Sequence, residues 1–486
     1  MRMRHYGTVL VSAIGFLLSG CMVGPRYAKP TVPVTPSFEE TEERKEGDGW
    51  KVAQPDDDLI RGKWWELYGD ARLNEIEEQV DSSNQDLKIA EANLRQARAA
   101  IRFNRASQAP TIGSSPSISD IRDSANQPYF PSSLANNGSG EFILPLDLSY
   151  EVDLWGRVRR SVAAAKQQAQ ASAADLQTAR LSLHAEVAID YFEVRSADAQ
   201  ERLLNDTVKA YTEALRLTQN RFEGGASPKS DVAQAETQLK AAQVLASDIT
   251  VQRSQYEHAL AILIGKPPAA FHLAVSPLNL EEPVLPCVPV TLPARLLERR
   301  PDIAAAERRM ASSNEQIGIA KAAYYPTLNL AAIAGLEGSS ILNWFSWPSR
   351  LWAVGPQLSE TLFDGGRRRA TSESARAGYD AAVAGYRQTI LDAFQQVEDN
   401  LVVLRLLSTE STQQQQATTA AEESLKLFQN RYAGGVDTYL QVVTSQTTAL
   451  TNERNDIDIL RRRLEANVLL IKAIGGGWDV SNLPPS

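Results

Sequence analysis

Few residues of this chain could do catalytic or metal chemistry. Its 486 residues include two cysteines and four histidines. The histidines lack the close spacing of metal ligands and are scattered at His5, His184, His258 and His272. The chain also contains no phosphate-binding GxxxxGK loop and no nucleophile motif. The sequence therefore predicts neither an enzyme nor a bound metal or cofactor.

Cys21 is the one residue for which the sequence predicts covalent chemistry. Residues 1–20 read as a secretory signal peptide, with a charged start and an apolar run too short to span a bilayer. The Leu-Ser-Gly triplet before Cys21 resembles the bacterial lipobox, whose cysteine becomes the acylated N-terminus. We expect diacylglycerol on the Cys21 sulfur and an N-acyl chain, each buried CH₂ adding roughly 0.8 kcal/mol of membrane affinity. The alternative is a plain signal peptide followed by an incidental cysteine.

Acylation of Cys21 would leave Cys287 without a partner for an intramolecular disulfide. We therefore expect Cys287 to be a small buried apolar residue. The net charge is −9, and it becomes −11 without residues 1–20, whose only charges are two arginines. This charge argues against a nucleic-acid partner. With 43% apolar residues, the chain can bury a sizeable core.

A repeat organises the rest of the chain. Residues 215–225 recur as residues 425–435 with seven of eleven positions identical, and the offset of 210 holds without a gap from Gly156 to Gly265. Each copy has a 67-residue run, 157–223 or 367–433, before its Gly-Gly pair and a shorter run after it. The pattern predicts two helical hairpins whose long arms reach about 100 Å.

Strands of membrane-crossing length precede each hairpin. Residues 142–155 alternate apolar and polar side chains with a period of two, which predicts a strand with one face toward lipid and one toward water. The second repeat offers residues 327–336 and 351–363. The strand expected at 111–121 is weaker, and the duplication is the reason to accept it.

The domain boundaries follow from these elements. The first repeat has its tip at 222–228, and the second has its tip at 432–437. The predicted order is a signal peptide at 1–20, a lipidated extended arm at 21–62, the first repeat at 63–265, a Pro-rich equatorial linker at 266–299, the second repeat at 300–475 and a C-terminal tail at 476–486.

Helix lengths predict how the hairpins are completed. The return helices after the tips are too short to reach the strands, and the helices expected before the strands, 85–109 and 302–325, have about the missing length. We therefore expect each pre-strand helix to stack end to end on a return helix. A narrow apolar stripe on the second return helix predicts its seam at Leu440, Val443, Thr447, Leu450, Ile457, Leu460, Leu464, Val468 and Ile471.

Four strands cannot close a barrel by themselves. An open sheet in lipid would leave edge N–H and C=O groups unsatisfied. Two chains would supply eight strands and a filled interior, whereas three would supply twelve strands and a lumen. Closure therefore favours a homotrimer, which also brings twelve helical columns.

The whole mature chain resembles the TolC-like outer membrane factors, specifically their lipoprotein efflux branch. The residues that carry the resemblance are Gly20 to Pro25, Trp64-Trp65 with Asp70 and Leu73, Arg299 to Ile303 with Ala306-Glu307, Phe363 to Arg367, the two Asn-Arg-aromatic-x-Gly-Gly tips, and Gly475 to Trp478. The resemblance implies a mainly α fold with a membrane β-barrel. In that fold a trimeric twelve-stranded barrel continues into a twelve-helix α-barrel.

The resemblance also implies a function. The chain would be a passive exit duct in the outer membrane for small molecules such as drugs or toxic compounds. It would dock on a periplasmic adaptor protein and, through it, on an inner-membrane pump of the RND type. Met22, where some lipoproteins have aspartate, agrees with export to the outer membrane.

The resemblance further implies roles for residues at the tips. The adaptor would meet Arg221, Gly224, Gly225, Arg431, Gly434 and Gly435. The alternative is that glycine only makes the turn and arginine only caps the helix end. The family's periplasmic aperture would be narrowed at Leu440, and its acidic position four residues later is Thr444 here. We hypothesise that Asp437 supplies the missing carboxylate ring.

Other functions remain open at this point. A periplasmic adaptor lipoprotein would show one hairpin flanked by β-rich segments, and a structural trimeric coiled coil would need no duplicated strands. An exit duct for type I protein secretion shares the design. The cargo leaves no signature in the sequence.

Overall fold

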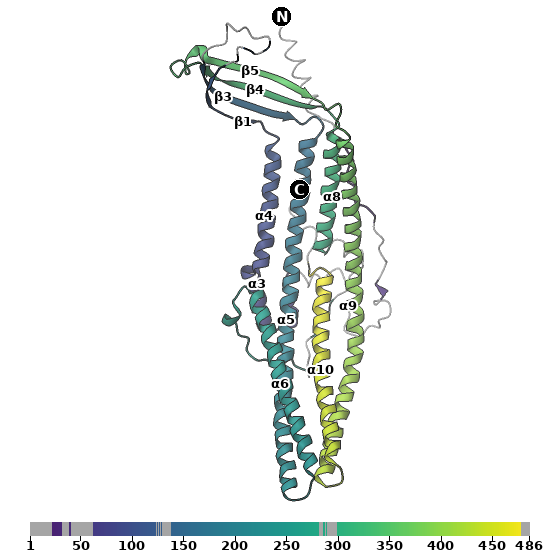
Figure 1. Ribbon diagram of the computed structural model, residues 1–486. Helices are drawn as coiled ribbons and strands as arrows, with labels where there is room; N and C mark the ends of the chain where they lie inside the picture. Colours follow the sequence, from purple (N-terminus) through teal and green to yellow (C-terminus); the bar gives the residue numbers. More distant parts are fainter. Residues whose placement is uncertain are drawn as a thin grey trace.

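The computed structural model describes residues 22–31, 38–39, 62–122, 138–280, 285–286, 288 and 299–477, with 124, 126 and 128. Cys21, Cys287, the signal peptide and residues 478–486 lie outside this set. The molecule is elongated, with a sheet across one end and long helices running away from it (Figure 1). No helix in the described ranges has both the length and the apolar character needed to cross a membrane.

Both repeats contain, in order, a helix, paired strands, a long helix and a return helix, and the first repeat has η2 and α3 in addition and its first strand in two pieces. The first consists of the 3₁₀ turn η2 (Trp64–Tyr68), α3 (Ala71–Ser83), α4 (Gln85–Ala106), β1 (Thr111–Gly113), β2 (Ser117–Ile121), β3 (Ser139–Val152), α5 (Arg157–Glu223) and α6 (Lys229–Leu263). The second consists of α8 (Pro301–Ala322), β4 (Thr327–Gly338), β5 (Arg350–Ser359), α9 (Arg367–Ala433) and α10 (Tyr439–Ala473). Short 3₁₀ turns lie at Pro268–Ala270 (η4) and Trp347–Ser349 (η5).

The long helices α5 and α9 have the 67 residues predicted for each. Each follows a glycine in the left-handed region, Gly156 with φ 81° or Gly366 with φ 92°. A carboxylate then accepts the free N–H groups of the first turn, since Asp153 accepts from Val158 N at 3.0 Å. Each helix thus begins where a glycine adopts the left-handed conformation and a nearby carboxylate accepts hydrogen bonds from the first N–H groups of the helix.

Two joints complete the helical columns. In the first, the Asn84 side chain donates to the carbonyl oxygen of Leu263 at 2.8 Å, which holds the start of α4 against the end of α6. In the second, Arg300 Nη1 donates to the carbonyl oxygen of Ala473 at 2.9 Å, which holds α8 against α10. The stacking predicted from helix lengths is therefore present, and each joint satisfies a helix-terminal carbonyl.

The strands form one antiparallel sheet in the order β1-β3-β4-β5, with β2 also paired to β3. The strand predicted at 111–121 is divided into β1 and β2 around Pro116, which has no N–H to donate. The strand predicted at 351–363 ends earlier, at Ser359, because its pairing partner β4 begins at Thr327, directly opposite. The strand predicted at 142–155 runs Ser139–Val152, and β4 extends two residues beyond 336.

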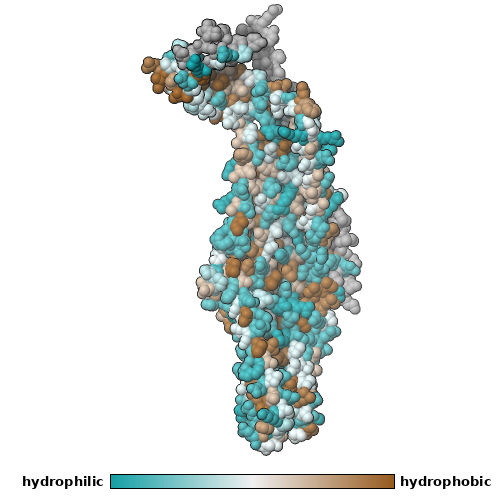
Figure 2. Space-filling model, in the orientation of Figure 1, coloured by the Kyte–Doolittle hydropathy of each residue, from teal (hydrophilic) through white to brown (hydrophobic). Residues whose placement is uncertain are grey.

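The sheet exposes large apolar side chains in the isolated chain. The exposed fraction is 56% for Leu146, 68% for Leu358, 73% for Val354 and 78% for Trp352. Figure 2 shows apolar side chains gathered at the outer end of the sheet, whereas polar ones cover much of the helical part.

The main core lies midway along the helices. Trp64, Tyr191 and Ile264 are among its buried members, and it joins η2 and α3 to α5 and to the ends of α6 and α10. The seam predicted for α10 is correct from Ile457 to Ile471 and partly correct near the tip, where Val443 and Leu450 are half-buried against core clusters. There Leu440 and Thr447 are exposed, and the buried side chains are those of Tyr439, Val442, Gln446 and Ala449.

The N-terminal arm lies along the upper ends of α5 and α8. The Val23 N–H donates to the carbonyl oxygen of Trp155 at 3.1 Å, and Arg160 donates to that of Pro25 at 3.3 Å. The fit is close at Gly24, where a Cβ would lie 2.7 Å from Gly318 Cα. The arm therefore binds at the junction of sheet and helices.

Candidate functional site

The hairpin tips lie at the end of the molecule opposite the sheet (Figure 1). In the first tip, Ala226 N donates to Arg221 O at 2.8 Å and Gly225 N donates to Phe222 O at 3.0 Å. The second tip repeats both bonds from Val436 and Gly435, at 2.9 and 3.0 Å. Both turns are Schellman motifs, in which two reverse bonds satisfy the last carbonyls of the helix.

These turns require glycine because of the backbone conformation at that position, and not because a side chain would lack room. Gly225 and Gly435 both have φ 73°, and a Cβ on either would meet nothing within 4 Å. The surface beside both glycines is therefore open. A partner could approach the backbone there closely.

The two tip arginines have different surroundings. Arg221 Nη1 donates to the carbonyl oxygen of Tyr432 at 3.0 Å, and its guanidinium carbon lies 4.6 Å from the centre of that ring. Arg431 instead forms an ion pair with Asp437 in its own tip, and 58% of its side chain is exposed. Arg221 thus ties the first tip to the second, whereas Arg431 faces solvent.

Apolar side chains surround the tips without being covered by the described part of the chain. A groove of about 670 Å³ lies between α9 and α10, and Leu427, Phe428 and Arg431 are among the residues that line it. The exposed apolar residues of both tips are Leu217, Phe222, Leu427, Val436 and Leu440. This surface combines apolar contact area with the Arg431–Asp437 pair.

Two of the predicted aperture residues, Leu440 and Thr444, lie on one exposed side of α10, and the third, Asp437, precedes that helix. Leu440 is 53% exposed, Thr444 follows one helical turn later, and Thr444 Oγ1 donates to the Leu440 carbonyl at 2.9 Å. That bond uses the hydroxyl proton of Thr444. The Asp437 carboxylate is paired with Arg431. If Asp437 forms a charged ring at the aperture, Arg431 therefore belongs to that ring as well and offsets the charge of each carboxylate.

Midway along the molecule, His184 belongs to a buried acid–base cluster. It stacks on Trp65 with 4.3 Å between ring centres, and Nδ1 lies 2.7 Å from Glu77 Oε2. Burial raises the pKa of Glu77 to about 7, against the opposing effect of His184. Burial opposes protonation of His184, but Asp81 and Glu77 outweigh it and raise its pKa. No group of residues in the described ranges could hold a metal ion.

Sequence reasoning missed the contacts that depend on tertiary structure. Nothing in the repeat distinguishes Arg221 from Arg431, although only Arg221 reaches across to the other hairpin. Nor does the spacing of Glu77 and His184 indicate their pairing. Asn84 carried a local signal, because it follows Ser82-Ser83 at a helix boundary and caps α4 through Leu87 N.

Comparisons with known proteins agree with this geometry. Residues 78–266 and 292–476 match the family model described as outer membrane efflux protein. The outer membrane protein OprJ of Pseudomonas aeruginosa is 31% identical over 480 residues, covering 99% of this chain and 97% of that protein. The toluene efflux pump outer membrane protein TtgI of Pseudomonas putida is 30% identical over 470 residues, with 96% and 97% covered.

Solved structures show the same fold. The outer-membrane channel OprN superposes with a TM-score of 0.86 at 28% identity, covering 94% of this chain and all of that one. The two hairpins and the single sheet also differ from the single hairpin expected of an adaptor. The chain therefore has a TolC-like fold, resides in the outer membrane, and belongs to the outer membrane efflux protein family.

Proposed function

We propose that this protein is the exit duct of a tripartite efflux system, passively conducting small toxic molecules from an inner-membrane pump and its adaptor to the outside. The observation that carries this proposal is an open-edged sheet with apolar side chains on its surface, set on a long helical half with open tips. Neither end is complete in one chain, and each fits a different surrounding. The relatives named as efflux pump outer membrane proteins support the same conclusion.

A homotrimer would complete the sheet end. One edge of the sheet is formed by β1 and β2 and the other by β5, and in one chain each edge leaves a row of backbone groups unpaired. In a bilayer such groups cost several kcal/mol each, so closure is required. Three copies would supply twelve strands, counting β1 and β2 as one, which encloses a lumen.

The helical half also favours assembly. Its outermost helices, α6 and α9, carry exposed apolar side chains in the isolated chain, among them Val244 at 67%, Val251 at 55%, Leu391 at 51% and Leu406 at 54%. Packing α9 of one copy against the column of α6 and α4 in the next would bury them. Three copies would then form a twelve-helix tube around a conduit.

The arm supports lipidation of Cys21 with diacylglycerol and an N-acyl chain. Met22, the next residue, packs on Gly156, where a Cβ would lie 2.8 Å from Met22 Cγ. Consecutive Cα atoms are about 3.8 Å apart, so a lipid on Cys21 would begin beside the junction of sheet and helices. A bilayer around the sheet would have its inner surface at this level.

The tips are the proposed contact with the adaptor. The groove beside Leu427 and Phe428 offers apolar surface next to the exposed guanidinium of Arg431. The open space at Gly435 permits close backbone approach. An adaptor helix with apolar side chains and a carboxylate would fit this surface.

The test uses a Gram-negative host that lacks its own duct and carries the matching pump and adaptor. We expect the chain to restore efflux of a fluorescent dye and to be recovered from the outer membrane as a trimer in mild detergent. Recovery as a soluble periplasmic protein or as a monomer would contradict the proposal. Mass spectrometry of the mature N-terminus tests the lipid, with Cys21→Ser as the matched control.

A further inference from the structure

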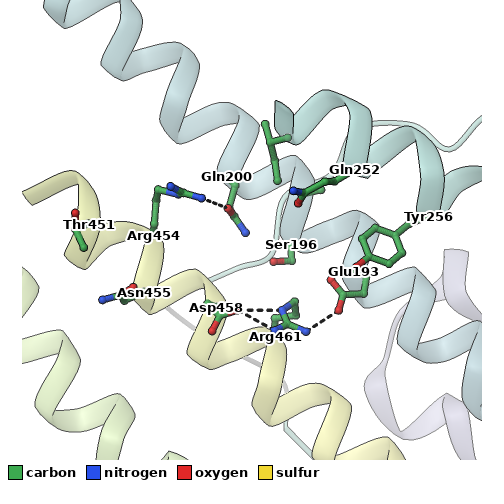
Figure 3. Close-up of a pocket in the computed structure, with 12 residues that line it drawn as sticks. Glu193, Ser196, Gln200, Gln252, Tyr256, Thr451, Arg454, Asn455, Asp458 and Arg461 are labelled. Atoms are coloured by element: carbon green, nitrogen blue, oxygen red, sulfur yellow. Dashed lines mark hydrogen bonds and ion pairs between the residues drawn. The ribbon is translucent and has the colours of Figure 1, made fainter. Parts of the chain in front are cut away.

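A polar pocket of about 460 Å³ lies where α5, α6 and α10 meet (Figure 3). α5 contributes Glu193, Ser196 and Gln200, and α6 contributes Tyr256. The face of α10 that lines it includes Thr451, Arg454, Asn455, Asp458 and Arg461. A pocket of this volume can accommodate a small organic molecule.

Two polar groups in this pocket lack partners among the described residues. Ser196 is 1% exposed, points into the pocket, and has no hydrogen-bond partner for its hydroxyl (Figure 3). Nε of Arg454 is also buried and unpartnered. The one bond of its guanidinium is a long contact of 3.5 Å with Gln200, and no carboxylate of the described chain pairs with it. Buried polar groups are normally satisfied, so both are free to bind a polar ligand that enters the pocket.

The charges in the pocket are separated along α10. At one end, Arg454 provides a guanidinium without a counter-charge. At the other end, Arg461 faces Glu193 at 2.6 Å, Asp458 at 2.8 Å and Glu465 at 3.3 Å. Three carboxylates against one guanidinium leave an excess of negative charge there. The helical rise places Arg454 and Asp458 about 6 Å apart along the axis.

The pocket lies on the same side of α10 as the predicted aperture. Leu440 and Thr444 are exposed near the tip, and Thr451, Asn455 and Asp458 continue at intervals of seven, four and three residues. Such intervals keep side chains on one face of a helix. If Leu440 faces the conduit of the proposed duct, on which this inference rests, the pocket opens to the same conduit.

We propose that this pocket binds small zwitterions from the conduit. The carboxylate of the ligand would accept hydrogen bonds from Arg454 and Ser196, and its ammonium group would lie against Asp458. The planar guanidinium matches a carboxylate geometrically, which favours this orientation over the reverse. The substrate class that this site would favour is small molecules with a carboxylate and an ammonium group a few bonds apart.

Isothermal titration calorimetry of the purified full-length protein in detergent tests the site. The probes are aminohexanoate, hexanoate and hexylammonium, which share a chain and differ in charge. We expect aminohexanoate to bind about tenfold more tightly than either singly charged probe, because it makes both charge-assisted contacts. Arg454→Gln should weaken aminohexanoate and hexanoate about tenfold without affecting hexylammonium. Asp458→Asn should weaken aminohexanoate and hexylammonium instead.

Arg462→Gln is the matched control, since Arg462 lies on the same helix outside the pocket and pairs with Glu410. It should leave all three affinities unchanged. Ser196→Ala removes only the buried hydroxyl and should weaken aminohexanoate about threefold, which decides the question if Arg454→Gln does not fold. Absence of binding, or equal affinity for all three probes, would overturn the proposal that the pocket binds zwitterions. Loss of dye efflux in cells would refute the duct and leave the calorimetric result standing.

Discussion

Alanine at Gly265 tests what holds the first joint together. Gly265 has φ 68°, and a Cβ on it would lie 2.4 Å from the carbonyl oxygen of Ser83. Gly225 has a similar φ of 73° but open space, so Gly225→Ala measures the conformational strain alone. That strain costs about 1–2 kcal/mol. Displacing the Ser83 backbone, and with it the buried bond of Asn84 to Leu263, raises the cost of Gly265→Ala to roughly 3–6 kcal/mol.

The assay is thermal unfolding of the detergent-solubilised protein with hydrogen exchange at the joint. Gly265→Ala should lower the Tm at least about twice as much as Gly225→Ala, following the ratio of these costs. Exchange should accelerate at the end of α6 and the start of α4 in Gly265→Ala only. Equal losses of Tm, or unchanged exchange at the joint, would refute the idea that close approach is what requires glycine there. Gly475→Ala should reproduce the result in the second repeat, since its Cβ would lie 2.1 Å from Arg299 O.

Three further predictions concern charged groups. Arg221→Gln removes the bond between the tips, so planar-bilayer recordings should show a larger open fraction, and an unchanged fraction would mean that the bond does not hold the tips. Asp437→Asn leaves Arg431 uncompensated and should lower cation-over-anion permeability; unchanged selectivity would contradict a role in the aperture. The raised pKa values of Glu77 and His184 mean that the folded state holds extra protons above pH 4.5, so Tm should fall as pH rises from about 5 to about 8. Glu77→Gln should weaken that dependence, and an equal dependence in the variant would rule the pair out as its source.

Helices were predictable from this sequence to a degree that strands were not. Glycine and proline end a helix through the local backbone, so the bounds of α5 and α9 could be taken from the sequence alone. A strand ends where its partner ends. Leu362 and Phe363 are apolar and follow β5 closely, yet the strand excludes them because its last residue with a partner on β4 is Ser359, opposite Thr327.

The candidate site was predictable in position but not in its contacts. The repeat placed glycine at both turns, and a glycine after a long helix implies a left-handed residue. The α10 seam was only partly predicted near the tip, where Leu440 points away from the buried side of the helix. Side-chain partners such as that of Arg221 depend on how two hairpins lie against each other, which no local pattern encodes.

The duplication gives a physical way to separate structural residues from functional ones. Where both copies need the same geometry, they keep it, as in the matching backbone bonds of the two tips and the matching glycines of the two joints. Where the two copies have different residues at matching positions, the fold that they share does not explain the difference. Arg221 ties the tips, whereas Arg431 pairs with Asp437, a residue with no counterpart after the first tip, where Ala226-Ser227-Pro228 stands. The second tip and the α10 face that follows it, from Leu440 to the zwitterion pocket, are therefore where control of passage should be sought.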